Sequence, residues 1–234
     1  MRTIRKSQSP QELIRWKSEN ADIPENLKYG RADFPSDALR NSLLLEQYHL
    51  CAYTMRSLKT KTECEAEGLT TASSCHVEHF LPQSRKAPNE DIDYQNMLAC
   101  YPPSQSKTAC HYCAHAKDDF DPKNGNFISP LDTNAENHFY FDRRGNIESD
   151  TDAGKNTIKI LNLNHQTLVN DRAATIKGFL QPRGKEISAR QAKRIAEQIM
   201  QADAQKKLSA YCVAISQTAV QYADRKEQRS ARMR

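Results

Sequence analysis

The chain has 234 residues, of which 38% are hydrophobic, and 34 Lys and Arg stand against 29 Asp and Glu, a net charge of +5. This balance excludes an intrinsically disordered polyelectrolyte. No stretch approaches the roughly 18 apolar residues of a membrane span, and no apolar core of a secretory signal follows the basic start MRTIRK. We therefore expect a cytoplasmic protein with no membrane association, whose seven Cys bind metal rather than form disulfides.

Residues 1–48 predict an N-terminal helical segment. Ser9-Pro10 is typical of a helix start, and Leu13, Ile14 and Trp16 follow within two turns. A second helix is predicted from Ser36, with apolar residues recurring on one face.

Residues 49–150 predict a module of a different kind. Six of the Cys lie between Cys51 and Cys113 in a stretch without long apolar periodicity, so we expect metal rather than a large core to stabilise it. Further on, the pattern HFYFD followed by Arg144-Gly145-Asn146 predicts short strands around a turn.

Residues 151–234 predict a helical region. The stretch 157–163 fits either a strand or a lead-in to a helix. Later helices are predicted around Leu168–Ile176, after a cap at Ser188, and from Leu208 to Tyr222. Their apolar residues either form a surface for docking a partner or pack on the module; they are Ile195, Ile199, Tyr211, Ile215 and Tyr222. The whole pattern predicts an α+β fold, a small metal-stapled core between helical flanks.

The residues that carry chemistry gather in SCHVEHFLPQS, which includes His76, Glu78 and His79. On a strand, His76 and Glu78 share a face and His79 points to the other. Asn96 follows, and then CHYCAHAKDDF supplies further Cys, His and Lys. A carboxylate with an imidazole or amide can hold a hard divalent cation, while a second imidazole deprotonates water. The set therefore suits hydrolysis of a phosphodiester.

Several of these motifs together resemble the HNH endonuclease (ββα-metal) family, and more narrowly the PtuB group, the HNH subunit of Septu-type and retron-associated anti-phage systems. The resemblance rests on Cys51-Ala-Tyr, VEHFLP at 77–82, YQNMLAC at 94–100, and Cys113 with Lys117 four residues on. The start MRTIRK and the later stretches HFYFDRRGNI and TIKILNLNHQTLVNDR extend it from residue 1 to about 172.

By this resemblance His79 is the general base, Glu78 is the acidic ligand of Mg²⁺ or Mn²⁺, and Asn96 fixes the loop that orients the base. The third family residue falls at Ala114, which carries no ligand atom. We expect His115 to take its place, with His76 or His111 as alternatives.

The resemblance also implies a structural zinc site of two knuckles. The first is normally C-x-x-C but reads Cys51-Ala-Tyr-Thr54 here. An all-thiolate set of Cys51, Cys100, Cys110 and Cys113 would restore tetrahedral Zn²⁺, with Cys64 and Cys75 as lesser alternatives.

The partners that the resemblance implies are a DNA or RNA substrate, an ABC-type ATPase of the PtuA kind, and in retron systems a reverse transcriptase with its non-coding DNA. The chain itself has no P-loop pattern. The rival interpretation is a zinc-stapled nucleic-acid-binding or adaptor subunit without hydrolytic activity.

Overall fold

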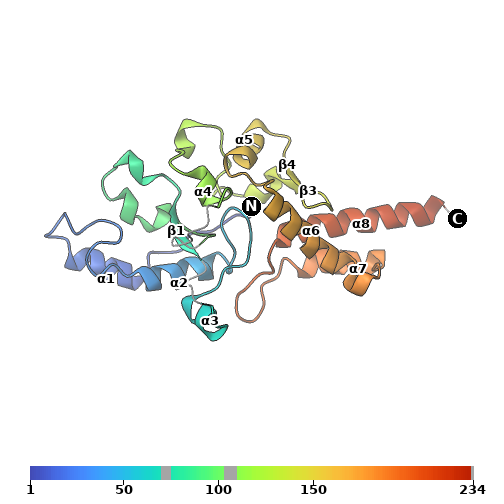
Figure 1. Cartoon of the computed structure of the whole chain (residues 1–234), viewed down its shortest axis with the longest axis horizontal. Helices are drawn as coiled ribbons and strands as arrows, with labels where there is room; N and C mark the ends of the chain where they lie inside the picture. Colours follow the sequence, from blue (N-terminus) through green and yellow to red (C-terminus); the bar gives the residue numbers. More distant parts are fainter. Residues whose placement is uncertain (70–74, 103–109, 233–234) are drawn as a thin grey trace.

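The computed structural model describes residues 1–69, 75–102 and 110–232, and it shows helices combined with two small antiparallel sheets (Figure 1). The α+β class is thus confirmed. The α-helices are α1 (Gln11–Glu19), α2 (Ser36–Glu46), α3 (Lys61–Ala66), α4 (Ala114–Lys117), α5 (Asp152–Ile160), α6 (Gln166–Leu180), α7 (Ala189–Gln198) and α8 (Cys212–Arg232). The strands are β1 (His76–His79), β2 (Met97–Cys100), β3 (Tyr140–Phe141) and β4 (Ile147–Glu148).

Both predicted N-terminal helices form. Helix α1 begins after Pro10 and buries Leu13 and Trp16, while Ile14 stays exposed. Helix α2 begins at Ser36 and buries its leucine face. The two helices pack against each other, and α2 also packs on β2, so this segment covers one side of the central hairpin.

Strands β1 and β2 form that hairpin, with His76 opposite Cys100 and His79 opposite Met97. The free edge of β2 is covered by α2's end, because the Gln47 side chain both donates to the Ala99 carbonyl (2.9 Å) and accepts from the Ala99 amide (2.8 Å). All four residues of β2 are buried. The hairpin is therefore held rigidly, although each strand has only four residues.

One continuous apolar core joins residues from all parts of the described chain. The Cys-rich stretch contributes to it strongly, since Tyr53, Tyr94 and Leu98 are fully buried. The expectation that this stretch has no large apolar core was wrong. Its apolar residues follow no helical or strand period, so only the tertiary packing shows that they share a core.

The second hairpin, β3 and β4, confirms the predicted turn. Gly145 has φ +85°, and a Cβ there would lie 2.2 Å from the Val169 carbonyl oxygen of α6. Stretch 157–163 is helical for most of its length, because it continues α5, which starts at Asp152 after Thr151, whose side chain accepts from the Gly154 amide. The two alternatives for this stretch are thus resolved in favour of helix.

Helices α6, α7 and α8 pack together, and α8 extends away from the rest to the C-terminal end (Figure 1). The predicted cap at Ser188 is present as a capping box with Gln191. Helix α8 starts at Cys212, later than predicted, because Tyr211 adopts φ +58°. Ile199, Tyr211, Ile215 and Tyr222 are buried, so these residues pack within the protein instead of forming an exposed docking surface. None of the described helices has the length and apolarity needed to cross a bilayer.

Candidate functional site

Three cysteines meet beneath the central hairpin. The sulfur atoms of Cys51, Cys100 and Cys113 all lie within 4.8 Å of one another, and all three residues are buried. The Sγ atoms of Cys51 and Cys113 are 3.4 Å apart. Tetrahedral zinc, with Zn–S bonds of about 2.3 Å, holds its sulfurs about 3.8 Å apart. The cluster can therefore hold a metal ion such as zinc.

The surroundings of Cys51 favour ionisation of its thiol, which suits binding of a cation. Burial by itself would raise the pKa of this thiol, but hydrogen bonds from Cys100, Cys113 and Thr54 outweigh burial and hold the pKa well below its usual range. Burial instead raises the pKa of Cys100 and of Cys113. The thiolate form is thus favoured most at Cys51, and a bound dication would draw protons from the remaining thiols.

The fourth predicted thiolate, Cys110, does not join this cluster. It is half-buried, and its Sγ lies 3.4 Å from the Tyr112 carbonyl oxygen. Thr54, which stands where a C-x-x-C knuckle would have its second Cys, is buried beside Cys51. The lesser alternatives, Cys64 and Cys75, are buried outside the cluster. The described residues therefore supply three thiolate ligands of the four predicted.

Strand β1 presents the other chemistry on its two faces, as its alternation predicted. His76 and Glu78 share one face, with Nε2 of His76 3.9 Å from Oε2 of Glu78. The Nδ1 of His76 contacts the Pro102 carbonyl oxygen. Because a carbonyl and a carboxylate both only accept, Nδ1 donates to Pro102 and a protonated Nε2 donates to Glu78, whereas in the neutral ring the lone pair of Nε2 is available to a cation. Burial by itself would lower the pKa of His76, but Glu78 and the carbonyl raise it overall.

Two buried side chains contact the other carboxylate oxygen of Glu78, Oε1. Lys117 Nζ lies 3.0 Å from Oε1, and the Tyr53 hydroxyl lies 3.3 Å from the same atom. Lys117 also donates to the His79 carbonyl oxygen at 3.2 Å. Since Oε1 is engaged in this way, Oε2 is the oxygen that faces His76 and remains for a cation.

His79 lies at the end of β1 with its ring on the opposite face. The ring packs edge-to-face on Tyr29, with centroids 4.8 Å apart, and its Nε2 is 2.8 Å from the Asp91 carbonyl oxygen. The carbonyl makes Nε2 the protonated nitrogen and leaves the lone pair on Nδ1. Burial lowers the pKa of His79 despite the carbonyl's opposing effect, so the imidazole is neutral at pH 7.

Asn96 ties together the loop that follows β1. Its Oδ1 accepts from the Leu81 amide at 2.7 Å, and its Nδ2 donates to the carbonyl oxygens of Leu81 and Glu90, both at 3.1 Å. The loop from 81 to 90 is closed by one side chain, and the same loop delivers the Asp91 carbonyl to His79. This is the loop-fixing contact expected for Asn96.

A groove of about 550 Å³ opens over this hairpin face and is bordered by His76, Glu78, His79, Ala114 and His115. The rings of His76 and His115 lie 5.7 Å apart between centroids. Burial lowers the pKa of His115, and the neighbouring His76 adds to this. Ala114 is buried and offers only a methyl group. His115 is thus the side chain of α4 that shares this groove with Glu78 and His76; the alternative His111 does not border it.

Sequence reasoning missed the roles of Lys117, Tyr53 and the Asp91 carbonyl. Lys117 was recognised as part of a motif, but nothing in its spacing shows that its side chain is buried against Glu78. Tyr53 is fully buried, yet its hydroxyl also reaches the carboxylate. The one signal in the sequence for the role of Tyr53 was its position two residues after Cys51. The cysteine cluster holds this stretch close to β1.

Comparisons with known proteins add no assignment. Neither the models of protein families nor the curated proteins contain a match to this chain.

Proposed function

We propose that the protein is a metal-dependent nuclease of the HNH type, with β1, β2 and α4 as its ββα element. One observation carries the proposal: Glu78, His76 and His115 share a single groove, which His79 also borders from the end of β1. Carboxylate and imidazole ligands suit a divalent cation such as Mg²⁺ or Mn²⁺.

The opposite orientation of His79 fits this chemistry. Displacement at phosphorus is in line, so the attacking water and the leaving oxygen lie on opposite sides of the phosphate. A base on one face of the strand and a cation site on the other can flank one phosphate at the strand end. When bound, the cation would stabilise the charge that develops on the phosphate and the leaving oxygen.

His79 is suited to take the proton from water. Its Nε2–H is held by the Asp91 carbonyl oxygen, which orients the ring and increases the basicity of Nδ1. Because burial lowers its pKa, the ring is unprotonated at neutral pH. Asn96 keeps the orienting carbonyl in place through the loop.

The test is cleavage of DNA and RNA by the His79→Ala protein in Mn²⁺ or Mg²⁺, with EDTA as the control. We expect at least a 10²-fold loss, the usual contribution of a general base, with metal content and the folded circular-dichroism spectrum retained. The matched control is His111→Ala, an exposed imidazole outside the groove, which should cleave like the unaltered protein. Undiminished cleavage by His79→Ala would falsify the assignment.

A second candidate is an adaptor that binds nucleic acid or a partner without hydrolysis. It is favoured by Ala114, which leaves the family's third ligand position without a donor atom, and by Lys117, which already neutralises Glu78. Absence of cation-dependent cleavage, together with unaltered nucleic-acid binding in EDTA, would support this candidate over the nuclease.

We also propose that the chain works in an anti-phage complex with an ABC-type ATPase, and in a retron context with a reverse transcriptase and its non-coding DNA. This proposal rests on the resemblance of the sequence motifs. Because the chain has no P-loop of its own, ATP dependence would come from the partner. Co-purification with an ATPase encoded beside this chain tests it; a monodisperse monomer from co-expression would count against it.

A further inference from the structure

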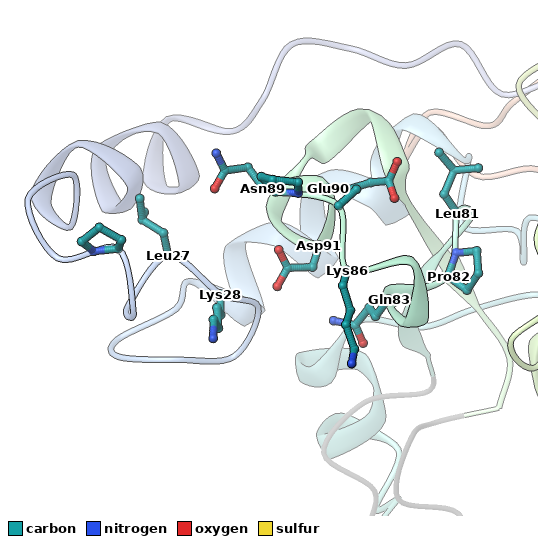
Figure 2. Close-up of a pocket in the computed structure, with 12 residues that line it drawn as sticks. Leu27, Lys28, Leu81, Pro82, Gln83, Lys86, Asn89, Glu90 and Asp91 are labelled. Carbon is teal, nitrogen blue, oxygen red and sulfur yellow. The ribbon is translucent and has the colours of Figure 1, made fainter.

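A second cavity lies beside the groove, on the other side of the loop after β1. It has a volume of about 540 Å³ and lies between residues 24–28 of the N-terminal segment and the loop 81–91 (Figure 2). Pro82 and Gln83 line both this cavity and the groove. We call it the flanking pocket; a strand of substrate that leaves the groove over Pro82 and Gln83 would enter it directly.

The wall formed by loop 81–91 is fixed before any ligand binds. Asn96 closes the loop through Leu81 and Glu90. Arg85 donates to Glu90 at 2.9 Å and also contacts Asp121. A ligand in the pocket therefore meets an ordered surface, which lowers the entropic cost of binding.

The two walls are also joined to each other, and through the same contact to His79. The Tyr29 amide donates to Asp91 Oδ2 at 3.0 Å, while the Asp91 carbonyl oxygen holds the His79 ring. The Tyr29 ring packs on that imidazole. The pocket thus adjoins the proposed base, and an occupant would lie next to the bond that is cleaved.

Two lysines and two carboxylates line the flanking pocket, and the lysines are the more exposed of these side chains. Both acidic side chains are engaged, Glu90 by Arg85 and Asp91 by the Tyr29 amide. Lys28 and Lys86 are exposed and take part in no ion pair within the described part of the chain. Figure 2 shows both lysines on the rim, one from each wall. Two such ammonium groups suit the phosphates of a nucleic-acid strand.

The rest of the lining suits a nucleobase. Leu27 supplies an apolar surface at one end of the pocket, and the side-chain amides of Gln83 and Asn89 can donate to and accept from a base edge. The volume falls in the range of small-ligand sites. Apolar contact, amides and flanking cations together match one nucleotide unit better than an acidic peptide, whose carboxylates need no flat apolar partner.

We propose that the flanking pocket binds the base and phosphates of the nucleotide next to the scissile phosphodiester, and so contributes to substrate selection. This rests on the proposed nuclease function. Lys28 and Lys86 contact the phosphates, Leu27 contacts the base, and Asn89 reads its edge.

The first test measures binding without cleavage. Fluorescein-labelled single-stranded DNA, single-stranded RNA and duplex DNA are titrated with the protein in EDTA, and anisotropy is followed at several salt concentrations. The variant Lys28→Gln/Lys86→Gln should bind a single strand more weakly and lower the slope of log K against log salt by about 1.4, at roughly 0.7 per phosphate. The matched control, Lys155→Gln/Lys159→Gln, removes the same charge from exposed positions of α5 outside both cavities.

Equal affinity and equal salt slope in the two double variants would overturn the proposal, and so would absence of binding by the unaltered protein. Binding of an acidic peptide in place of nucleic acid would overturn it as well. Because all four lysines are exposed, unchanged melting temperatures are expected, and these confirm that the comparison reports on binding.

The second test locates the base. A substrate with a single abasic nucleotide at successive positions should lose at least about fivefold in kcat/KM at one position beside the cut, in line with base contacts elsewhere. In Leu27→Ala that loss should shrink. If the unaltered protein cleaves the substrate but no abasic position lowers kcat/KM, the flanking pocket is refuted while the proposed nuclease function stands. If nothing is cleaved yet Lys28→Gln/Lys86→Gln still weakens binding, the nuclease is refuted and the pocket remains a nucleic-acid site.

Discussion

The cysteine cluster and the groove are built on the same hairpin, yet they are organised in opposite ways. His76 of the groove lies across the ladder from Cys100 of the cluster. The cluster is fully buried and consists of soft sulfur ligands, whereas the groove is open and combines a carboxylate with imidazoles. Structural metal sites are closed and catalytic ones keep an open position. The contrast teaches that one face of a short hairpin can border both a buried thiol cluster and an open polar groove.

Lys117 connects the two regions. It belongs to α4, which starts directly after Cys113, and its ammonium reaches both Glu78 and the His79 carbonyl oxygen. Metal at the cluster would hold the start of α4, and α4 in turn holds the oxygen of Glu78 that faces away from the groove. Substitutions made in the cluster and beside the groove, one at a time, therefore test how the two regions differ.

The largest effect is expected from Cys100→Ser. It removes a ligand from a residue that is completely buried, and loss of a structural metal is among the few changes that cost about 4 kcal/mol or more. We expect lost zinc in elemental analysis and a much lower melting temperature. Cys212→Ser, a buried thiol outside the cluster, should keep its metal; loss of metal in this control as well would contradict a specific cluster.

The next largest effect is expected from Lys117→Met. It leaves Glu78 buried without its cation, and breaking a buried pair from one side costs about 3 kcal/mol or more. Denaturant unfolding measures this loss, and a second change, Glu78→Gln, should recover part of it. The exposed pair Lys193–Glu227 provides the matched control, since Lys193→Met should cost no more than about 0.5 kcal/mol. Equal costs at the two sites would show that Lys117 does not hold the carboxylate.

A gain is expected from Thr54→Cys. Thr54 is buried beside Cys51 at the position of the missing knuckle residue, so a fourth thiolate there would complete a tetrahedral set. We expect zinc to bind at least about tenfold more tightly in competition with a chelator, with nuclease activity unchanged because the groove is untouched. Thr54→Val is the control, and it should not gain affinity.

The smallest effect is expected in the pH dependence of kcat/KM. Burial holds the pKa of His79 below its ordinary value, which is about 6.5. Only the neutral ring can accept a proton, so activity should be constant at neutral pH. It should fall about tenfold per pH unit once the pH drops below the lowered pKa. Tyr29→Ala exposes the ring and should move the midpoint upward toward 6.5. A midpoint above 7 in the unaltered protein would contradict a buried, neutral base.

Local patterns predicted a good part of the structure. The helix starts near Pro10, at Ser36 and at Ser188 follow from local sequence signals, which depend on neighbouring residues only, although a side-chain cap forms at Ser188 and at neither of the other two. The turn at Gly145 and the opposite faces of Glu78 and His79 follow from local geometry as well. The cysteine ligands were predicted in part, because Cys51, Cys100 and Cys113 do meet whereas Cys110 does not.

What the sequence determined by itself is the inventory and its spacing: thiols, imidazoles and a carboxylate placed close together, with the strand period that separates Glu78 from His79. Only the tertiary structure decided which of these groups meet. The contact of Lys117 with Glu78 spans 39 positions, and that of Asp91 with His79 spans 12. Such contacts depend on how the core brings distant segments together, and no local period records that. The physical reason is that burial is collective: a side chain's partner is chosen by the packing of the whole core.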